Sequence, residues 1–197
     1  QAAHWCIMAL KATLQRAIRP STTRSTAALW AKSLLNAVLF SCIFMVSLPW
    51  LAHQLLPPQL PLPPLTRTWL AGALAGVGVA GWVACLHSFS RHGRGTPLPA
   101  DAPRHLVTGG LFRLARNPIM SAELLVIWAI ALYVGSLGVA LYALAITAAA
   151  HFMVVHIEEP ELRKRFGETY AEYCRNTPRW LPSIRRQGRR QAAKHTA

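Results

Sequence analysis

The hydrophobic residues of this chain are concentrated in long uncharged runs. Residues 34–56 contain no charged side chain, and residues 69–86 form a second uncharged run that is rich in glycine and alanine. A helix needs about 20 apolar residues to cross the hydrocarbon core of a bilayer, and spanning helices that pack closely are often rich in small residues. The pattern therefore predicts two transmembrane helices, joined by the short proline-rich segment 57–64.

A third stretch, residues 124–155, also lacks Asp, Glu, Lys and Arg, but it is too long for one crossing. The sequence Gly-Ser-Leu-Gly at 135–138 lies near its middle, where the two glycines favour a turn. We therefore expect a helical hairpin with arms at 122–134 and 139–157. The first arm is short, so we expect it to tilt or to cross only part of the membrane.

Two further segments have the periodicity of amphipathic helices. In residues 1–19, apolar side chains recur at helical spacing beside three cations, which predicts a helix on the membrane surface. Residues 161–175 form the second, and Pro160 suits its first turn. Its apolar stripe consists of Leu162, Phe166, Tyr170 and Tyr173.

The positive charges mark one side of the predicted membrane. The chain has 21 Lys and Arg against 7 Asp and Glu, a formal net charge of +14. Only Arg67 lies between the first two spans, while the other 20 cations lie before the first span, between the second span and the hairpin, or after the hairpin. The positive-inside rule then places both termini and the middle loop in the cytoplasm. Apolar core helices of a soluble protein would not sort charge in this way, so an integral membrane protein of the bacterial inner membrane is expected.

The amino-acid composition excludes several other classes of protein. Hydrophobic residues make up 53% of the chain and charged residues 14%, against about 25% charged in a typical soluble domain. Such an apolar chain fits neither a disordered protein nor an ordinary nucleic-acid-binding domain. The four cysteines form no CxxC pair, which argues against a disulfide scaffold. We expect the cations to contact anionic lipid headgroups, with no nucleic acid as partner.

Motifs of common enzyme chemistries are weak in this sequence. Gly76, Gly78 and Gly81 match GxGxxG, but they lie inside an apolar run, so close helix packing is their expected role. The eight histidines have no HExxH or zinc-finger spacing, so no metal site is predicted. No GxSxG motif supports nucleophilic catalysis.

The segments on either side of the hairpin carry the candidate chemistry. Residues 93–122 read GRGTPLPADAPRHLVTGGLFRLARNPIMSA and combine glycine, proline and several arginines. Glu158 and Glu159 follow the second arm of the hairpin, immediately before Pro160. Two carboxylates at this place favour the start of a helix electrostatically, or they close a pocket around a polar ligand together with the arginines. The residue types alone leave both interpretations open.

Three ordered blocks around the hairpin resemble the isoprenylcysteine carboxyl methyltransferase family, within the wider group that includes the phospholipid methyltransferases. They read GRGTPLP, HLVTGGLFRLARNP and EEPELRKRFGETYAEYCRNTPRWLP, between residues 93 and 182. The resemblance implies an all-α, polytopic membrane helix bundle without a Rossmann domain that uses S-adenosylmethionine. Its cofactor pocket would lie on the cytoplasmic side, between the loop, the hairpin and the C-terminal helix. The acceptor, a lipophilic or small carboxylate, thiol or amine, would enter from the bilayer.

The resemblance also implies the site residues. The first cofactor-binding cluster corresponds to Arg104, His105, Leu106 and Val107, and the next aromatic position is Phe112. The family's RHPxY motif corresponds to Arg116, Asn117, Pro118, Ile119 and Met120, and its acidic cofactor contact corresponds to Glu158.

Positioning roles are expected for Arg116, Asn117 and Glu158. Glu158 would bind the ribose hydroxyls or the amino group of the cofactor, and Arg116 would tie the loop to Glu159. No residue is assigned as a catalytic acid, base or nucleophile, because transfer from a sulfonium is an in-line displacement that depends mainly on alignment.

The chain departs from the eukaryotic members of that family at three positions. The motif's His is Asn117, its Tyr is Met120, and an arginine that those members tie to the substrate is Val154. Asn keeps its hydrogen bonds but cannot become a cation, and Met keeps bulk without a hydroxyl. The departures leave the acceptor open. They also keep two alternatives: a non-catalytic membrane accessory protein of the same fold, and a membrane reductase resembling the usually much longer sterol reductases.

The predicted organisation therefore has four parts. An N-terminal interfacial segment covers residues 1–33, and two transmembrane helices cover residues 34–92. A methyltransferase-like core covers residues 93–182, and a basic, mobile tail covers residues 183–197. The sequence does not predict the oligomeric state.

Overall fold

The computed structural model describes residues 35, 38–39, 41–57, 59–92 and 106–180, without the side chains of 89–92. Its helices are η1 (Cys42–Ser47), α3 (Leu48–Leu55), α4 (Pro64–His92), η3 (Gly110–Arg113), α5 (Pro118–Val134), α6 (Leu137–Met153), η4 (Val154–Glu158) and α7 (Glu159–Asn176). These residues form no β-strand, which confirms the all-α class. The expected amphipathic helix at 1–19 and the tail at 183–197 lie outside the described residues.

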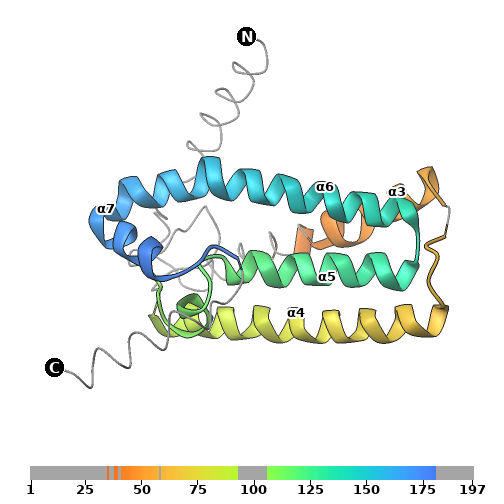
Figure 1. Ribbon diagram of the computed structural model, residues 1–197, viewed down its shortest axis with the longest axis horizontal. Helices are drawn as coiled ribbons and strands as arrows, with labels where there is room; N and C mark the ends of the chain where they lie inside the picture. The colour runs from red at the N-terminus through yellow and green to blue at the C-terminus, as the bar shows by residue number, and fades with distance from the viewer. Residues whose placement is uncertain (1–34, 36–37, 40, 58, 93–105, 181–197) are drawn as a thin grey trace, which may run out of the picture.

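The long helices α4, α5 and α6 lie alongside one another (Figure 1). At one end, here named the turn end, lie the turn between α5 and α6 and the connection between α3 and α4. At the other end, named the α7 end, the chain continues from α6 into α7. Among the described residues, two helical stretches are long and apolar enough to cross a membrane: Pro64–Ser88, and the stretch Leu137–Asn176 that joins α6, η4 and α7.

The expected hairpin is confirmed, with small shifts of its bounds. Gly135 ends α5 in the left-handed conformation, with φ 69°, and α6 begins two residues later. The first arm has 17 residues, which corresponds to a helix length of about 25 Å. This is shorter than a hydrocarbon core of about 30 Å, as expected from the sequence.

The turn end is closed by polar contacts between the turn and the proline-rich connection. The Gly135 carbonyl accepts a hydrogen bond from the Leu60 N–H at 2.7 Å, and the Leu56 carbonyl accepts from the Ser136 hydroxyl at 2.9 Å. A side chain at Gly135 would run into the guanidinium of Arg67. The one cation between the first two predicted spans therefore covers the hairpin turn.

The first predicted span contains a π-helical turn, η1, which the hydrophobic pattern did not indicate. The Leu48 N–H bonds to the Ile43 carbonyl, five residues back. The next π-type donor would be residue 49, but Pro49 has no N–H. The Tyr142 hydroxyl of α6 instead donates to the Phe44 carbonyl at 2.6 Å. A tertiary hydrogen bond thus joins α6 to the irregular turn, as apolar surroundings require of exposed backbone groups.

The sequence predicted a continuous amphipathic helix at 161–175. The helix is present, but the prediction that it is continuous was wrong. Helix α7 runs from Glu159 to Asn176, but Gly167 inside it has φ 52° and ψ −128°. Glycine adopts this left-handed backbone region at little cost. The chain therefore turns sharply at Gly167, and the second half of α7 returns toward α5 (Figure 1). Tyr170, on the predicted apolar stripe, is almost completely buried.

Small residues let α4 and α5 approach closely, as predicted for the GxGxxG sequence. A Cβ atom at Gly78 would lie 2.8 Å from the Ala122 carbonyl oxygen and 2.9 Å from Cγ2 of Val126. A Cβ atom at Gly81 would lie 3.5 Å from the Ala122 Cβ. At Gly76 nothing lies within 4 Å. Gly78 and Gly81 therefore form the packing face, whereas Gly76 faces away from α5.

We predict opposite effects for alanine at Gly76 and at Gly78. Alanine favours a helix interior over glycine by about 1 kcal/mol, so Gly76→Ala should maintain or raise stability. Gly78→Ala should lower stability by about 1–3 kcal/mol, because backbone atoms of α5 must move. Thermal unfolding in detergent micelles, followed by circular dichroism, measures both. Equal unfolding temperatures for the two variants would contradict this packing.

Candidate functional site

The described candidate residues lie at the α7 end of the bundle, on the loop before α5 and on the turn before α7. Arg104 and His105 lie outside the described residues. Leu106 is half-buried at the edge of the described part of this loop.

The apolar candidates form one wall against α4. Val107 and Phe112 are buried together with Cys85 of α4, and Ile119 packs against this cluster. The Phe112 carbonyl accepts a 2.6 Å hydrogen bond from the Tyr173 hydroxyl of α7. Burial raises the pKa of Tyr173, which keeps the phenol protonated as a donor. The loop before α5 is thus held between α4 and α7.

The backbone before α5 pairs with the segment that follows α7. The Arg116 N–H donates to the Pro178 carbonyl at 2.8 Å, and the Asn117 N–H donates to the Arg179 carbonyl at 3.2 Å. The Asn117 side-chain amide donates to the same Arg179 carbonyl at 3.4 Å. Asn117 is buried and Pro118 occupies the first turn of α5. The motif position therefore fixes the start of α5 against a segment about sixty residues later.

Glu159 lies between two arginines. Its carboxylate oxygens accept hydrogen bonds from Nε and Nη2 of Arg179 at 2.7 and 2.9 Å. Nη2 of Arg116 lies 3.2 Å from Oε1, and the Arg116 and Glu159 side chains are 11% and 10% exposed. The expected tie between Arg116 and Glu159 is thus confirmed. Burial alone would raise the pKa of Glu159, but the Arg179 hydrogen bond and the Arg116 charge outweigh it and lower that pKa.

The neighbouring Glu158 has a different environment. Its side chain is half-buried and makes no hydrogen bond or ion pair with the residues that the structure describes. Burial raises the pKa of Glu158, and the adjacent charge of Glu159 raises it further. Two consecutive carboxylates therefore differ: Glu159 is paired with two arginines, and Glu158 has no partner among the described residues.

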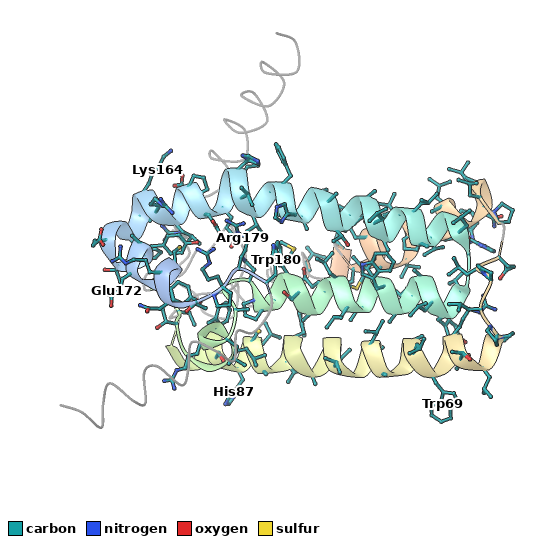
Figure 2. All side chains as sticks on the ribbon, in the orientation of Figure 1. Trp69, His87, Lys164, Glu172, Arg179 and Trp180 are labelled. Carbon is teal, nitrogen blue, oxygen red and sulfur yellow. The ribbon has the colours of Figure 1, made fainter. Side chains whose placement is uncertain are left out.

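The sequence did not single out Arg179, Tyr173 or Trp180 as site residues. Figure 2 shows Arg179 and Trp180 in the space between α6 and α7 on one side and α5 on the other. The Trp180 indole N–H donates to Nδ1 of His151 on α6 at 3.1 Å. The last block of the resemblance ends in RWLP and contains Arg179 and Trp180, but only the fold shows which residues they contact.

The described residues offer no metal site and no disulfide. In the described part of the chain, no group of three or more His, Cys, Asp or Glu side chains lies close enough to hold a metal ion. Cys42, Cys85 and Cys174 are free thiols. Met120 is half-buried, and no contact of its side chain assigns it a role.

Comparison with protein families decides the class. The phospholipid methyltransferase model matches residues 66–169, from the start of α4 into α7, which is just over half of the chain. The chain belongs to the phospholipid methyltransferase family. This confirms the wider group and makes the protein a membrane methyltransferase by family, in agreement with its long apolar helices. No protein with a curated description matches significantly.

The extent of this phospholipid methyltransferase match also changes the domain picture. The sequence blocks began at residue 93, and the hydrophobic spans before them were not distinctive. The family region begins at residue 66 instead, so it includes α4 and its packing face for α5. The wall formed by Cys85, Val107 and Phe112 therefore lies entirely within the family region.

We predict that Glu159 contributes far more to stability than an exposed ion-paired carboxylate. Glu159→Ala would leave Arg116 and Arg179 facing each other in a largely buried place, which should cost about 3 kcal/mol. The matched control is Glu168→Ala, whose partner Arg175 and own side chain are largely exposed, so little change is expected. Thermal unfolding in micelles compares the two. Similar losses would show that the Glu159 pairs are not special.

The lowered pKa of Glu159 also predicts a dependence on pH. Because the pKa is lower in the folded state, the ion pairs stabilise fully above the ordinary Glu pKa of about 4.3. Their contribution then falls as pH drops through the folded value. The stability difference between wild type and Glu159→Gln should be constant above about pH 5 and shrink in more acidic solution. A difference that grows on acidification would have the wrong sign.

Proposed function

We propose that this protein is a membrane methyltransferase that takes its methyl group from S-adenosylmethionine and transfers it to an acceptor reached from the bilayer. The observation that supports this most directly is the contrast between Glu158 and Glu159 at the α7 end. Glu159 is held by two arginines, whereas Glu158 is half-buried without a partner among the described residues. A desolvated, unpaired carboxylate favours a ligand that brings its own hydrogen-bond donors.

The residues at the α7 end fit the chemistry of this cofactor. Glu158 would accept hydrogen bonds from the ribose hydroxyls or the amino group. The backbone of 104–107 would hold the remainder, and Phe112, Asn117, Pro118, Ile119 and Met120 would shape the surrounding loop and the start of α5. The cofactor supplies an activated methyl group on a sulfonium. The charge pattern of the sequence would place this pocket and both termini in the cytoplasm, in a bacterial inner membrane.

The protein's own contribution would be alignment and exclusion of water. Displacement at a sulfonium methyl needs the acceptor in line, and a rigid site supplies much of the rate. Arg116 and Asn117 have their backbone fixed by the segment after α7, and Arg116 also binds Glu159. They therefore act as positioning residues that hold the loop against α7. A carboxylate or thiolate acceptor would need little beyond this alignment, whereas an amine or alcohol must also lose a proton.

The acceptor we propose is a lipophilic or small carboxylate, thiol or amine. The position at which eukaryotic isoprenylcysteine carboxyl methyltransferases have a substrate-linked arginine is Val154, which is completely buried. No cation is therefore available there to pair with a prenylcysteine carboxylate. Asn117 and Met120 likewise provide neither a cation nor a hydroxyl. These substitutions favour an enzyme of the wider family that methylates a different acceptor. They argue against an enzyme that methylates prenylcysteine.

Titration of the purified protein with S-adenosylhomocysteine tests the cofactor site. We predict that Glu158→Ala weakens binding at least about tenfold, because a charge-assisted hydrogen bond is lost. The matched control is Glu161→Ala, which removes a nearby carboxylate that pairs with Lys164 and should leave the affinity unchanged. Isothermal titration calorimetry in nanodiscs measures both. Equal affinities for wild type and Glu158→Ala would contradict the assignment.

Transfer of a radiolabelled methyl group to membrane extracts tests the activity itself. Label in lipid would identify a lipid acceptor, and label in a small prenyl thiol would identify a small lipophilic one. Absence of label, together with no retained S-adenosylhomocysteine, would contradict methyl transfer and favour an accessory role. A nicotinamide retained on purification would instead favour a reductase.

A further inference from the structure

The four residues after α7, Thr177 to Trp180, form a short segment that we name the strap. Thr177 is 5% exposed, and its N–H donates to the Tyr173 carbonyl at 2.9 Å, at the end of α7. From there the chain passes between α5 and the α6–α7 stretch, where Figure 2 shows Arg179 and Trp180. The strap therefore crosses the α7 end of the hairpin.

One side of the strap is firmly held. Its Pro178 and Arg179 carbonyls accept hydrogen bonds from the N–H groups of Arg116 and Asn117. The Arg179 guanidinium makes two hydrogen bonds to the largely buried Glu159. Charge-assisted, bidentate pairs of this kind are about twice as strong as neutral hydrogen bonds. This side thus has the properties of a hinge.

On its other side the strap has one polar contact with the described residues. Trp180 donates one hydrogen bond, 3.1 Å long, to Nδ1 of His151, and the two ring centroids lie 5.9 Å apart. His151 itself is exposed on the surface of α6, beside the exposed Phe152 and Met153. A single neutral hydrogen bond at an exposed position contributes only about 1 kcal/mol. Opening at this contact is therefore far easier than release from Glu159.

The arms of the hairpin separate toward the strap. Near the turn they share a buried cluster of Ile127, Ala131, Val139 and Ala143. The Trp128 indole then bonds to the Thr147 hydroxyl at 3.1 Å. Beyond this point α5 and α6 diverge toward the α7 end (Figure 1). His151 lies one helical turn past Thr147, so the Trp180 contact joins the strap to α6 beyond the Trp128–Thr147 hydrogen bond.

We propose that the strap is a gate on the bilayer side of the site, with the Trp180–His151 hydrogen bond as a latch that opens to admit a lipophilic acceptor. The identity of the molecule that the gate admits rests on the function proposed above. The opening of the gate does not depend on that function. The apolar, exposed surface beside His151 lets a molecule dissolved in the bilayer reach the latch without crossing water. The hinge at Glu159 keeps the loop and the start of α5 in place while the latch is open.

A buried reporter thiol tests whether the latch opens. Val154 is completely buried and lies one helical turn beyond His151. Val154→Cys is prepared in full-length protein whose native cysteines are replaced by serine or alanine, and it is reacted in nanodiscs with the membrane-permeable reagent N-ethylmaleimide. Trp180→Phe and His151→Leu should each accelerate labelling about fivefold, because one neutral hydrogen bond no longer favours the closed state. His151→Gln retains an acceptor and should label like the parent.

The matched control is Trp128→Phe, which removes an equivalent indole hydrogen bond to α6 away from the strap. It should leave the labelling rate unchanged. The gate is overturned if Trp180→Phe and His151→Leu label at the parent rate, or if Trp128→Phe accelerates labelling equally, since that would be general loosening. Circular dichroism melts confirm that each variant is folded.

A parallel titration separates the gate from the proposed function. His151→Leu should bind S-adenosylhomocysteine with unchanged affinity, because the hinge and Glu158 are intact. A large loss of affinity in this variant would overturn the assignment of His151 to a latch. If neither the wild type nor any variant binds S-adenosylhomocysteine, the proposed function is contradicted. The labelling rates would still decide whether the strap opens.

Discussion

The carboxylate of Glu159, held between Arg116 and Arg179, is the interaction on which the α7 end depends. It joins three segments that lie far apart in the sequence: the loop before α5, the start of α7 and the strap after it. Glu159 and Arg116 are largely buried in this group, and Arg179 is partly exposed. Such a group is costly to bury unless every partner is present. The arrangement therefore requires one mutual position of loop, helix and strap.

The same pairing determines what its neighbour does. With both arginines bound to Glu159, Glu158 receives no neutralising charge from the described residues, and the adjacent carboxylate and its own burial both raise its pKa. A carboxylate in this situation gains more than an exposed one from a ligand with donor groups. The π-helical turn η4 ends at Glu158, and Glu159 follows it. The two carboxylates with different environments therefore lie on either side of the end of this turn. Irregular turns of this kind are frequent at functional sites.

Much of the fold could be predicted because it depends on local pattern. The hairpin follows from an overlong apolar run with glycines in its middle, and Gly135 does end α5. The packing role of Gly78 follows from its place in an apolar helix. The tie between Arg116 and Glu159 could be predicted because the resemblance placed Arg116 and Glu158, the neighbour of Glu159, at the cofactor. The break at Gly167 was missed, since a single glycine inside an amphipathic pattern is compatible with a continuous helix.

The contacts that could not be predicted are those between distant segments. The periodicity of the strap sequence does not show that its carbonyls bond to the start of α5. It also does not show that Arg179 makes two hydrogen bonds to Glu159. The π-helical turn η1 was missed for a similar reason. Pro49 indicates a disturbance of the helix, but its form depends on a tyrosine from α6. The extension of the family region through α4 was hidden because apolar spans look alike in composition.

The hydrogen bond from Tyr142 to the Phe44 carbonyl has a consequence for biogenesis. Its partners are separated by 98 residues, so the chain around η1 is synthesised well before the tyrosine that bonds to it. The irregular turn η1 acquires this donor only when α6 is inserted beside it. The packing of the second hairpin arm thus completes the hydrogen bonding of the first predicted span.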